Sequence, residues 1–303
     1  MADLPTRPAF KFKDTPTWLL VGAFWLFGQL PWNVQLAVGR GLGHLAYFLL
    51  KRRRHIAATN IALCFPHLSA AEQKALTRAT MVSTGEAITE IAAAYINPRV
   101  NLVERLTVEG LEHLEAAKKE GGVLLLGMHL NTIDAGSRLL GDGAKIPFSA
   151  VYRPNNNPIL DWLIAWGRGR FVEQYIDRKD MRSLIRQLRA GNTVWYAPDQ
   201  DYGKEQTVFA PFFGVQTSTI TTTTRIAKMG RATVIPISHF RLPKGRYKIV
   251  FGKPLENFPS GDDVTDATII NQTIEREVMK APEQYLWVHR RFKTRPEGEE
   301  RFY

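Results

Sequence analysis

Cysteine is almost absent from this sequence, since Cys64 is the only cysteine among 303 residues. A single thiol excludes an internal disulfide, and it excludes any metal or redox site built on a Cys-x-x-Cys pair. This composition fits a protein of the reducing cytoplasm, where disulfides are rare. We expect Cys64 to pack in the protein interior.

Several motifs that mark common enzyme classes are missing as well. The sequence contains no Gly-x-Ser-x-Gly, no P-loop, no Gly-x-Gly-x-x-Gly and no His-Glu-x-x-His. The first absence argues against a serine acyl-enzyme of the α/β-hydrolase kind, and the others remove the usual phosphate-cradling and zinc-binding signatures. What remains is chemistry in which a histidine acts as a base on a substrate hydroxyl.

No uncharged run near the amino terminus is long enough to cross a bilayer without help from its flanks. The stretch TWLLVGAFWLFGQLPW (17–32) would make a helix of roughly 24 Å, whereas the hydrocarbon core is roughly 30 Å thick. Basic residues lie before it, and KRRRH (51–55) follows, as expected at a cytoplasmic face. We therefore predict a membrane anchor or interfacial segment over residues 1–55 and a globular domain over 56–303. An aromatic-rich core helix is the alternative.

Positive charges outnumber negative charges by 11. This excess implies an anionic partner, which can be a nucleic acid, a phospholipid surface, or a phosphorylated or carboxylated substrate. Charge alone does not choose among these partners. The basic flanks of the hydrophobic stretch favour a membrane.

Beyond a helical amino-terminal part, apolar strands alternate with amphipathic helices. Ser69 and Glu72 predict a capping box at the start of a long helix. Strands are expected at 122–128, 147–152, 193–197, 232–240 and 246–251, and helices at 133–140, 157–166, 180–190 and 217–229. This order predicts an α/β fold with a mixed, largely parallel sheet flanked by helices. The last two strands are expected to form an antiparallel hairpin at an edge of the sheet.

His129 and Asp134 are the first candidates for chemistry, because catalytic residues of parallel sheets collect beyond the carboxyl ends of the strands. His129 is the first polar residue after VLLLGM, and Asp134 lies five positions later in HLNTID. Five positions correspond to about 140° of helix rotation, so the two side chains meet only if His129 precedes a helix and Asp134 lies in its first turn. Asp134 would then accept a hydrogen bond from Nδ1 of His129 and leave Nε2 as a general base. The alternative is a helix-terminus aspartate beside a satisfied core histidine.

Two further loops carry polar residues directly after predicted strands. Arg153 in VYRPNNNP could bind a phosphate or a thioester carbonyl, or pair with an acid such as Asp199. WYAPDQDYG places Asp199, Asp201 and Gly203 after another strand. Two acids could bind Mg²⁺, orient an arginine or position a hydroxyl, but turns also favour Asp and Gly. We do not expect a dedicated metal site.

Taken together, these blocks resemble the bacterial lipid A late acyltransferases, the lauroyl, myristoyl and palmitoleoyl transferases of the glycerolipid acyltransferase superfamily. The resemblance runs from the hydrophobic amino terminus to nearly the end of the chain. It rests on HLNTID, VYRPNNNPILDWL, DRKD, VWYAPDQDYG and APEQYLWVHRRFKTRPEG, which occur in that order. Many members have Glu where this sequence has Asp134, which is shorter by one methylene.

The resemblance implies an enzyme on the cytoplasmic face of the bacterial inner membrane. It would transfer a fatty acyl group from acyl carrier protein to a hydroxyl of the (Kdo)2-lipid A precursor, directly and without a cofactor, a metal or an acyl-enzyme. Its partners would be acyl carrier protein, the lipid A precursor and membrane lipids, and not nucleic acid. The family's catalytic signature falls on His129 and Asp134. The substrate-binding blocks fall on Arg153, Asp199, Asp201 and Gly203.

The basic tail HRRFKTR, which contains Arg290 and Arg291, is a further candidate for substrate binding. It could meet phosphates, Kdo carboxylates, lipid headgroups or the acidic carrier protein, or it could be a solvated basic surface. Two alternative functions stay open at this point. One is a glycerol-phosphate or lysophospholipid O-acyltransferase, which the block PDQDYG disfavours because that branch carries a Glu-Gly-Thr pattern. The other is a non-enzymatic basic protein that binds membranes or nucleic acid.

Overall fold

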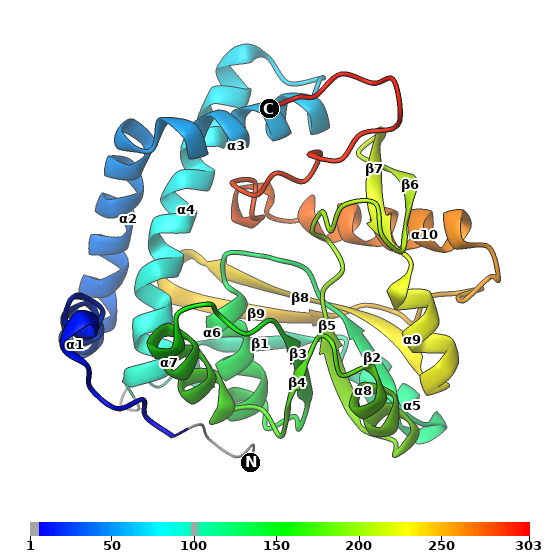
Figure 1. The fold of residues 1–303 in the computed structure, drawn as a ribbon, viewed down its shortest axis with the longest axis horizontal. Helices are drawn as coiled ribbons and strands as arrows, with labels where there is room; N and C mark the ends of the chain where they lie inside the picture. The colour runs from blue at the N-terminus through cyan, green and yellow to red at the C-terminus, as the bar shows by residue number, and fades with distance from the viewer. Residues whose placement is uncertain (1–5, 98–100, 102) are drawn as a thin grey trace.

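The computed structural model of the chain describes residues 6–97, 101 and 103–303. Its amino-terminal part is helical and its remainder alternates strands with helices (Figure 1). The helices of the first part are α1 (Thr15–Gly28), α2 (Trp32–Leu49), α3 (Lys51–Cys64) and α4 (Ala70–Ile96). The later helices are α5 (Leu111–Glu120), α6 (Ile133–Arg138), α7 (Pro158–Gly169), α8 (Met181–Arg189), α9 (Thr222–Gly230) and α10 (Asp263–Val278).

A seven-stranded sheet forms the centre of the molecule, in the order β1-β9-β8-β2-β5-β3-β4. Its strands are β1 (Leu106–Glu109), β2 (Val123–Leu126), β3 (Ser149–Tyr152), β4 (Tyr175–Asp177), β5 (Thr193–Tyr196), β8 (Thr233–Leu242) and β9 (Arg246–Phe251). Every pairing in it is parallel except β8 with β9. A separate antiparallel hairpin consists of β6 (Thr207–Phe212) and β7 (Val215–Ile220). The predicted α/β class with a mixed, largely parallel sheet is therefore confirmed.

The sheet is buried on both faces, as its apolar strands require. In β2, Leu124 and Leu126 belong to a core shared with α8, α9 and α10, whereas Val123 and Leu125 belong to a core shared with α5 and α6. Because side chains alternate along a strand, one short apolar run supplies both layers. Cys64 is buried in the first of these cores, as expected for a structural thiol.

Helix α4 is the long support against which the amino-terminal helices pack. Ser69 accepts a hydrogen bond from the backbone N–H of Glu72, whose carboxylate binds the Ser69 N–H, so the predicted capping box is present. Helices α2 and α4 run side by side at the left of Figure 1. Their contact needs glycine, because a Cβ on Gly43 would lie 2.4 Å from the Cα of Val82.

The amino-terminal helices expose many large apolar side chains. Those of α1 and α2 are Leu19, Leu20, Trp25, Leu26, Val34, Val38, Leu42, Leu45, Phe48 and Leu49. Other apolar groups of the same segment are packed: Trp18 contacts Trp162 of α7, and Trp32 is buried against Tyr247. Within the described residues, no helix combines the length and the apolar composition that a membrane span requires. Helix α3 runs through residue 55, where we placed the segment boundary.

Two predictions about local structure were wrong. The helix expected at 217–229 begins only at Thr222, because residues 215–220 form β7. This segment is rich in β-branched residues, and they suit a strand better than a helix. The antiparallel hairpin of β8 and β9 is confirmed, but β1 pairs in parallel outside β9, so the hairpin does not form the edge of the sheet.

Candidate active site

His129 and Asp199 meet beyond the carboxyl ends of two neighbouring parallel strands. Strands β2 and β5 pair with Leu126 opposite Tyr196, and each of the two residues lies three positions past that pair. Nδ1 of His129 lies 2.5 Å from Oδ1 of Asp199, and the backbone N–H of His129 donates to Oδ2 at 2.8 Å. The carboxylate therefore holds both the ring and the backbone of the histidine.

The electrostatics of this pair favour a charged acceptor. Burial raises the pKa of Asp199, but the His129 ring and the two hydrogen bonds outweigh burial and bring the pKa down to about 2. Asp199 is thus an anion at neutral pH, and an anionic oxygen at Nδ1 requires the proton to lie on that nitrogen. Nε2 of a neutral His129 is then left as an acceptor, and one quarter of the His129 side chain is exposed to receive a substrate.

Asp134 does not contact His129 in the way that we predicted. As expected, His129 precedes α6 and Asp134 lies in its first turn. The Asp134 carboxylate, however, accepts hydrogen bonds from the hydroxyl of Tyr95 and from Nε of Arg168, the latter at 2.5 Å. The first turn of α6 directs this side chain toward α4 and α7, whereas strand register brings Asp199 to Nδ1. The predicted partner of His129 was therefore wrong, and Asp199 takes that place.

Asp134 instead fixes a cation in the wall of the site. Burial by itself would lower the pKa of Arg168, but the Asp134 carboxylate more than compensates and the pKa is raised well above its ordinary value. The Tyr95 hydroxyl accepts a further hydrogen bond from Nε of Arg168, at 2.9 Å. Arg168 is therefore a permanent, oriented guanidinium. Nothing in its local sequence marks it, because its role depends on how α7 packs against α4 and α6.

A groove of about 830 Å³ opens in front of His129. Its cationic lining residues are Arg153, Arg168, Arg178, Lys179 and Arg225, and its apolar lining includes Ile133, Val151, Met181, Trp195, Ile220 and Met229. Arg153 lines this groove and forms no ion pair with a described carboxylate, so its predicted alternative role as a partner of Asp199 is not realised. A groove with apolar walls and several cations suits an anionic amphiphile.

Asp201 and Gly203 shape the loop after β5, and neither lines the groove. The Asp201 carboxylate accepts hydrogen bonds from the Thr294 N–H at 2.7 Å, the Thr294 hydroxyl at 2.8 Å and the Gly203 N–H at 2.9 Å. Gly203 has φ +94°, which a residue with a Cβ rarely adopts. Asp201 thus holds the carboxyl-terminal segment against the loop that carries Asp199, and Gly203 provides the turn in that loop.

The two arginines of the basic tail lie in different surroundings. Arg291 is buried and donates to the Ser218 carbonyl at 2.8 Å, so its guanidinium ties the tail to β7. Arg291 is therefore not part of a solvated basic surface, which was the alternative for the tail; it lines a small cavity together with His129 and Asp199, and its contact with substrate stays a prediction. Arg290 lies over the ring of Tyr303 in a basic pocket of the carboxyl-terminal segment.

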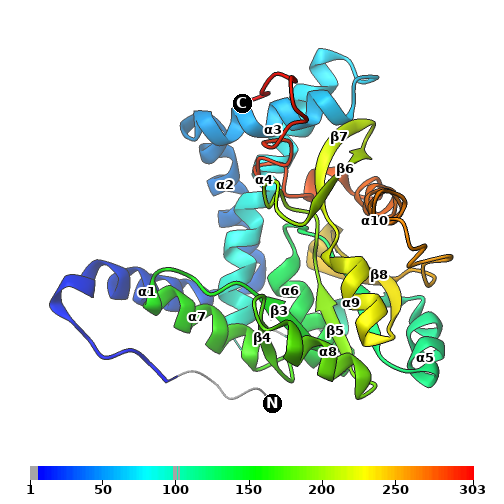
Figure 2. The same ribbon diagram turned by 45° about the vertical axis from the view of Figure 1, so that its right-hand side comes forward.

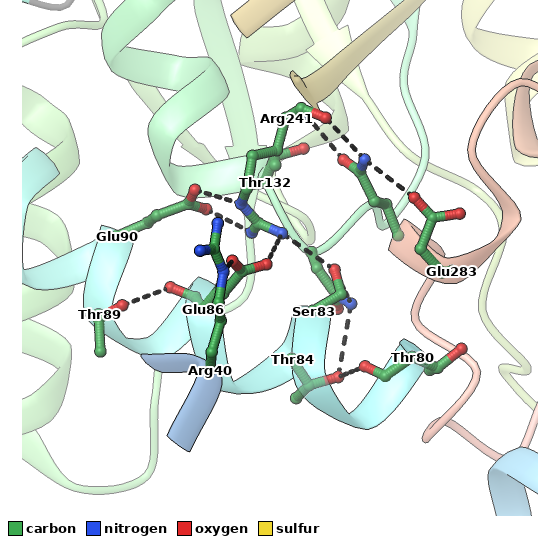
Figure 3. A network of polar contacts seen from close by, with 12 residues as sticks. Arg40, Thr80, Ser83, Thr84, Glu86, Thr89, Glu90, Thr132, Arg241 and Glu283 are labelled. Carbon is green, nitrogen blue, oxygen red and sulfur yellow. Dashed lines mark hydrogen bonds and ion pairs between the residues drawn. The ribbon is translucent and has the colours of Figure 1, made fainter. Parts of the chain in front are cut away.

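A buried polar network supports the segment that follows His129 (Figure 3). Arg241 of β8 binds Glu90 at 2.5 Å and Glu86 at 2.8 Å, both on α4, and Arg40 of α2 binds Glu86 from the other side. Arg241 also donates a hydrogen bond to the Ser83 hydroxyl. The same hydroxyl accepts a hydrogen bond from the side-chain amide of Asn131, which lies two residues after His129. The network therefore joins α2, α4 and β8 to the loop that carries His129 and Asn131. Sequence spacing gave no sign of it.

Among the residues that the structure describes, no group of three or more His, Cys, Asp or Glu side chains has the arrangement to hold a metal ion. The site consists of a histidine and carboxylate pair, a positioned guanidinium and a groove with cationic and apolar walls. Such a set can remove a proton from a hydroxyl and stabilise negative charge nearby.

Comparison with known proteins finds a family and several relatives that match most of the chain. The sequence model of a family described as bacterial lipid A biosynthesis acyltransferase matches residues 8–294. The lipid A biosynthesis lauroyltransferase of Escherichia coli K12 is 41% identical over 285 residues, which cover 93% of this chain and 92% of that protein. The palmitoleoyltransferase of the same organism is 37% identical over 95% of this chain and 94% of its own length. The lipid A biosynthesis myristoyltransferase of the same organism is 30% identical over 93% of this chain and 88% of its own length.

Proposed function

Because the chain belongs to the bacterial lipid A biosynthesis acyltransferase family and is thus an acyltransferase, we propose that it transfers a fatty acyl group from acyl carrier protein to a hydroxyl of the (Kdo)2-lipid A precursor. Family membership decides against a non-enzymatic basic protein. The acyl-carrier donor, the Kdo-bearing acceptor and the roles of individual residues are our proposal. The hydrogen bond between His129 and Asp199 is the observation that carries it.

In this proposal His129 is the general base and Asp199 its charged partner. A hydroxyl is a weak nucleophile, so Nε2 of His129 takes its proton as the oxygen attacks the thioester carbon. The new C–O bond forms, the C–S bond breaks, and the proton passes from His129 to the departing thiolate of the carrier. Asp199 stabilises the imidazolium between these two transfers, since a carboxylate at Nδ1 favours a positively charged ring. No acyl-enzyme is formed.

The cations of the groove support an acceptor that carries phosphate. Arg153 and Arg168 lie in the same groove as His129 and supply positive charge for acceptor phosphates or for the oxyanion of the tetrahedral intermediate. In this role Asp134 positions Arg168 and does not touch the reacting atoms. The apolar residues of the groove provide a surface for acyl chains.

The exposed apolar side chains of α1 and α2 support attachment to the cytoplasmic face of the inner membrane. Contiguous apolar surface of this kind marks membrane or protein contacts, and helices at an interface bury such a face among lipids. The basic start of α3, Lys51–Arg54, would meet anionic headgroups. Cosedimentation with anionic phospholipid vesicles tests this: Leu19→Glu with Leu20→Glu should release the protein, and unchanged binding would contradict the assignment.

The decisive experiment combines purified protein with acyl carrier protein bearing a fatty acid and with the (Kdo)2-lipid A precursor. Mass spectrometry should show addition of one acyl group, and His129→Ala should lower the rate by at least about 10³-fold, the scale of general base catalysis. His67→Ala, at an exposed histidine, is the matched control. Acylation of glycerol 3-phosphate or a lysophospholipid in place of the precursor would refute the acceptor. Full activity of the His129 variant would refute the base.

A further inference from the structure

The last residues of the chain form a second basic concavity, distinct from the groove at His129. This C-terminal pocket has a volume of about 480 Å³. Its charged lining residues are Lys204, Arg290, Lys293, Arg295, Arg301 and Glu299. Five cations thus line the pocket with one carboxylate, and a second carboxylate, Asp201, pairs with Lys293 at 3.7 Å, which still leaves an excess of positive charge. An electropositive concavity attracts and orients an anionic partner.

Most of this positive charge is not neutralised within the protein. Lys204, Arg290 and Arg301 form no ion pair with any carboxylate that the structure describes. Arg295 pairs with Glu299 and donates to the Gln216 carbonyl, yet its Nε has no hydrogen-bond partner among the residues that the structure describes, although only 9% of the side chain is exposed. A buried donor without an acceptor is costly, and an anionic ligand would satisfy it.

The pocket is held rigidly despite its lack of regular secondary structure. Thr294 is bound to the Asp201 carboxylate through both its N–H and its hydroxyl, and the Tyr303 hydroxyl is bound to the Asn60 side chain of α3. Arg290 and Arg295 lie over the rings of Tyr303 and Phe302, respectively. A preformed surface loses little conformational entropy when a partner binds.

The loop after β5 separates this pocket from the groove. Its residues Gln200, Tyr202 and Glu205 line the groove, whereas Lys204 lines the C-terminal pocket. Asp199, which holds His129, is two residues from Asp201, which holds Thr294. A partner bound in the pocket therefore lies one loop away from the reaction centre.

We propose that the C-terminal pocket is the docking surface for the acidic face of acyl carrier protein, an inference that rests on the donor named under Proposed function. The acyl group of the carrier is attached through a flexible pantetheine arm, so the protein can bind beside the groove while its thioester reaches His129. The groove has its own cations for acceptor phosphates. No exposed large apolar side chain lines the pocket. Helix α1 lies at the opposite end of α2 from the carboxyl terminus (Figures 1 and 2), although Phe48 and Leu49 are exposed at the near end of α2. These features favour a soluble acidic protein over a lipid headgroup.

The test reverses two exposed cations of the pocket, in the double variant Lys204→Glu with Arg301→Glu. We expect the KM for acyl-carrier donor to rise about tenfold with kcat within about twofold, because rim charges act mainly on encounter and affinity. The KM for a small donor, acyl-phosphopantetheine, should not change. Fluorescence anisotropy should show a matching loss of affinity for labelled holo carrier protein, and the wild-type affinity should fall as salt rises.

The matched control is Lys118→Glu with Lys119→Glu, an equal charge change on exposed residues of α5, which lies far from the C-terminal segment in Figure 1. A rise in KM no larger than in this control would overturn the docking surface. The docking surface would also be overturned if the double variant lost its binding to anionic vesicles but kept its affinity for carrier protein, because the pocket would then be a lipid headgroup site. If the wild-type protein uses acyl-phosphopantetheine but not the acyl-carrier donor, the proposed donor itself is refuted, and this result is distinct from a failed pocket.

Discussion

Replacement of Asp199 by asparagine is the sharpest test of the site. Asparagine keeps the shape of the side chain but removes the charge that accepts hydrogen bonds from Nδ1 and the backbone N–H of His129, at 2.5 and 2.8 Å. Its amide can present an NH2 group to Nδ1, which would force the ring proton onto Nε2, the nitrogen that must accept the substrate proton. Loss of the correct tautomer in a hydrolase triad costs roughly 10⁴ in kcat, so we expect kcat to fall about 10³- to 10⁴-fold. This corresponds to roughly 4–5 kcal/mol of transition-state stabilisation.

Asp134→Asn separates the two possible partners of His129. It leaves the hydrogen bond between His129 and Asp199 in place and removes the charged partner of Arg168. We expect a smaller loss of kcat, about 10- to 100-fold, because the base stays correctly protonated and only the orientation of a guanidinium suffers. Arg168→Lys should resemble this variant, since a lysine cannot reproduce the hydrogen bonds from a guanidinium Nε.

The assay is the initial rate of acyl transfer with donor and acceptor saturating, together with a thermal unfolding curve for each variant. Asp263→Asn, at an exposed aspartate of α10, serves as the control for loss of a carboxylate. A much larger loss of kcat in Asp134→Asn than in Asp199→Asn, with both proteins folded, would refute the assignment and return Asp134 to the role of catalytic partner.

Two further predictions concern stability. Burial lowers the pKa of His239 and of His289 to about 4 in the folded protein. Between pH 6.5 and pH 4 the unfolded chain therefore binds protons that the folded chain does not. The free energy of unfolding should fall as the pH falls through this range. For the fully buried His239 the free energy of unfolding should be about 2 kcal/mol lower at pH 5 than at pH 7. Urea titrations at the two pH values should detect this loss, and the variant His239→Gln should lack the part that His239 contributes. Equal stability of the wild-type protein at both pH values would contradict the prediction. Gly43→Ala should lower the free energy of unfolding by about 2 kcal/mol or more, because the new Cβ would overlap α4. Gly41→Ala is the matched control: a Cβ at Gly41 would lie in open space, and alanine should stabilise α2 by up to about 1 kcal/mol. Equal effects of the two substitutions in urea titrations would refute close packing of α2 on α4.

Much of the site's location could be predicted from the sequence, because parallel strands collect their following loops at one edge. His129, Asp199 and Arg153 each follow an apolar run, and the structure places His129 and Arg153 on the same groove and Asp199 behind His129, bound to its Nδ1. Four of the five predicted strands overlap their observed positions closely, and the fifth, Arg246–Phe251, matches at both ends. An apolar run bounded by turn residues carries this information locally.

The partners of these residues could not be predicted, because they depend on contacts between distant parts of the chain. The spacing of His129 and Asp134 is local and fixes only where each lies relative to α6. The choice of Asp199 over Asp134 depends on the pairing of β2 with β5, which joins residues 70 positions apart. Strands β1, β4 and β6 escaped prediction. The sequences of β1 and β4, LTVE and YID, lack the continuous apolar run that marked the equally short β2.

The division of labour between the two aspartates has a physical reason. The charge of Asp134 is already balanced by Arg168, to which it is bound at 2.5 Å, and a carboxylate so paired would attract a developing imidazolium only weakly. Asp199 forms no ion pair with a lysine or arginine among the described residues, and its two hydrogen bonds from His129 are the main attraction on its buried charge, to which the more distant Arg291 adds a smaller one. A carboxylate stabilises a transient positive charge more strongly when it is not already paired with a permanent cation. In our proposal Asp199 therefore stabilises the imidazolium, and Asp134 holds Arg168, the permanent cation of the groove wall.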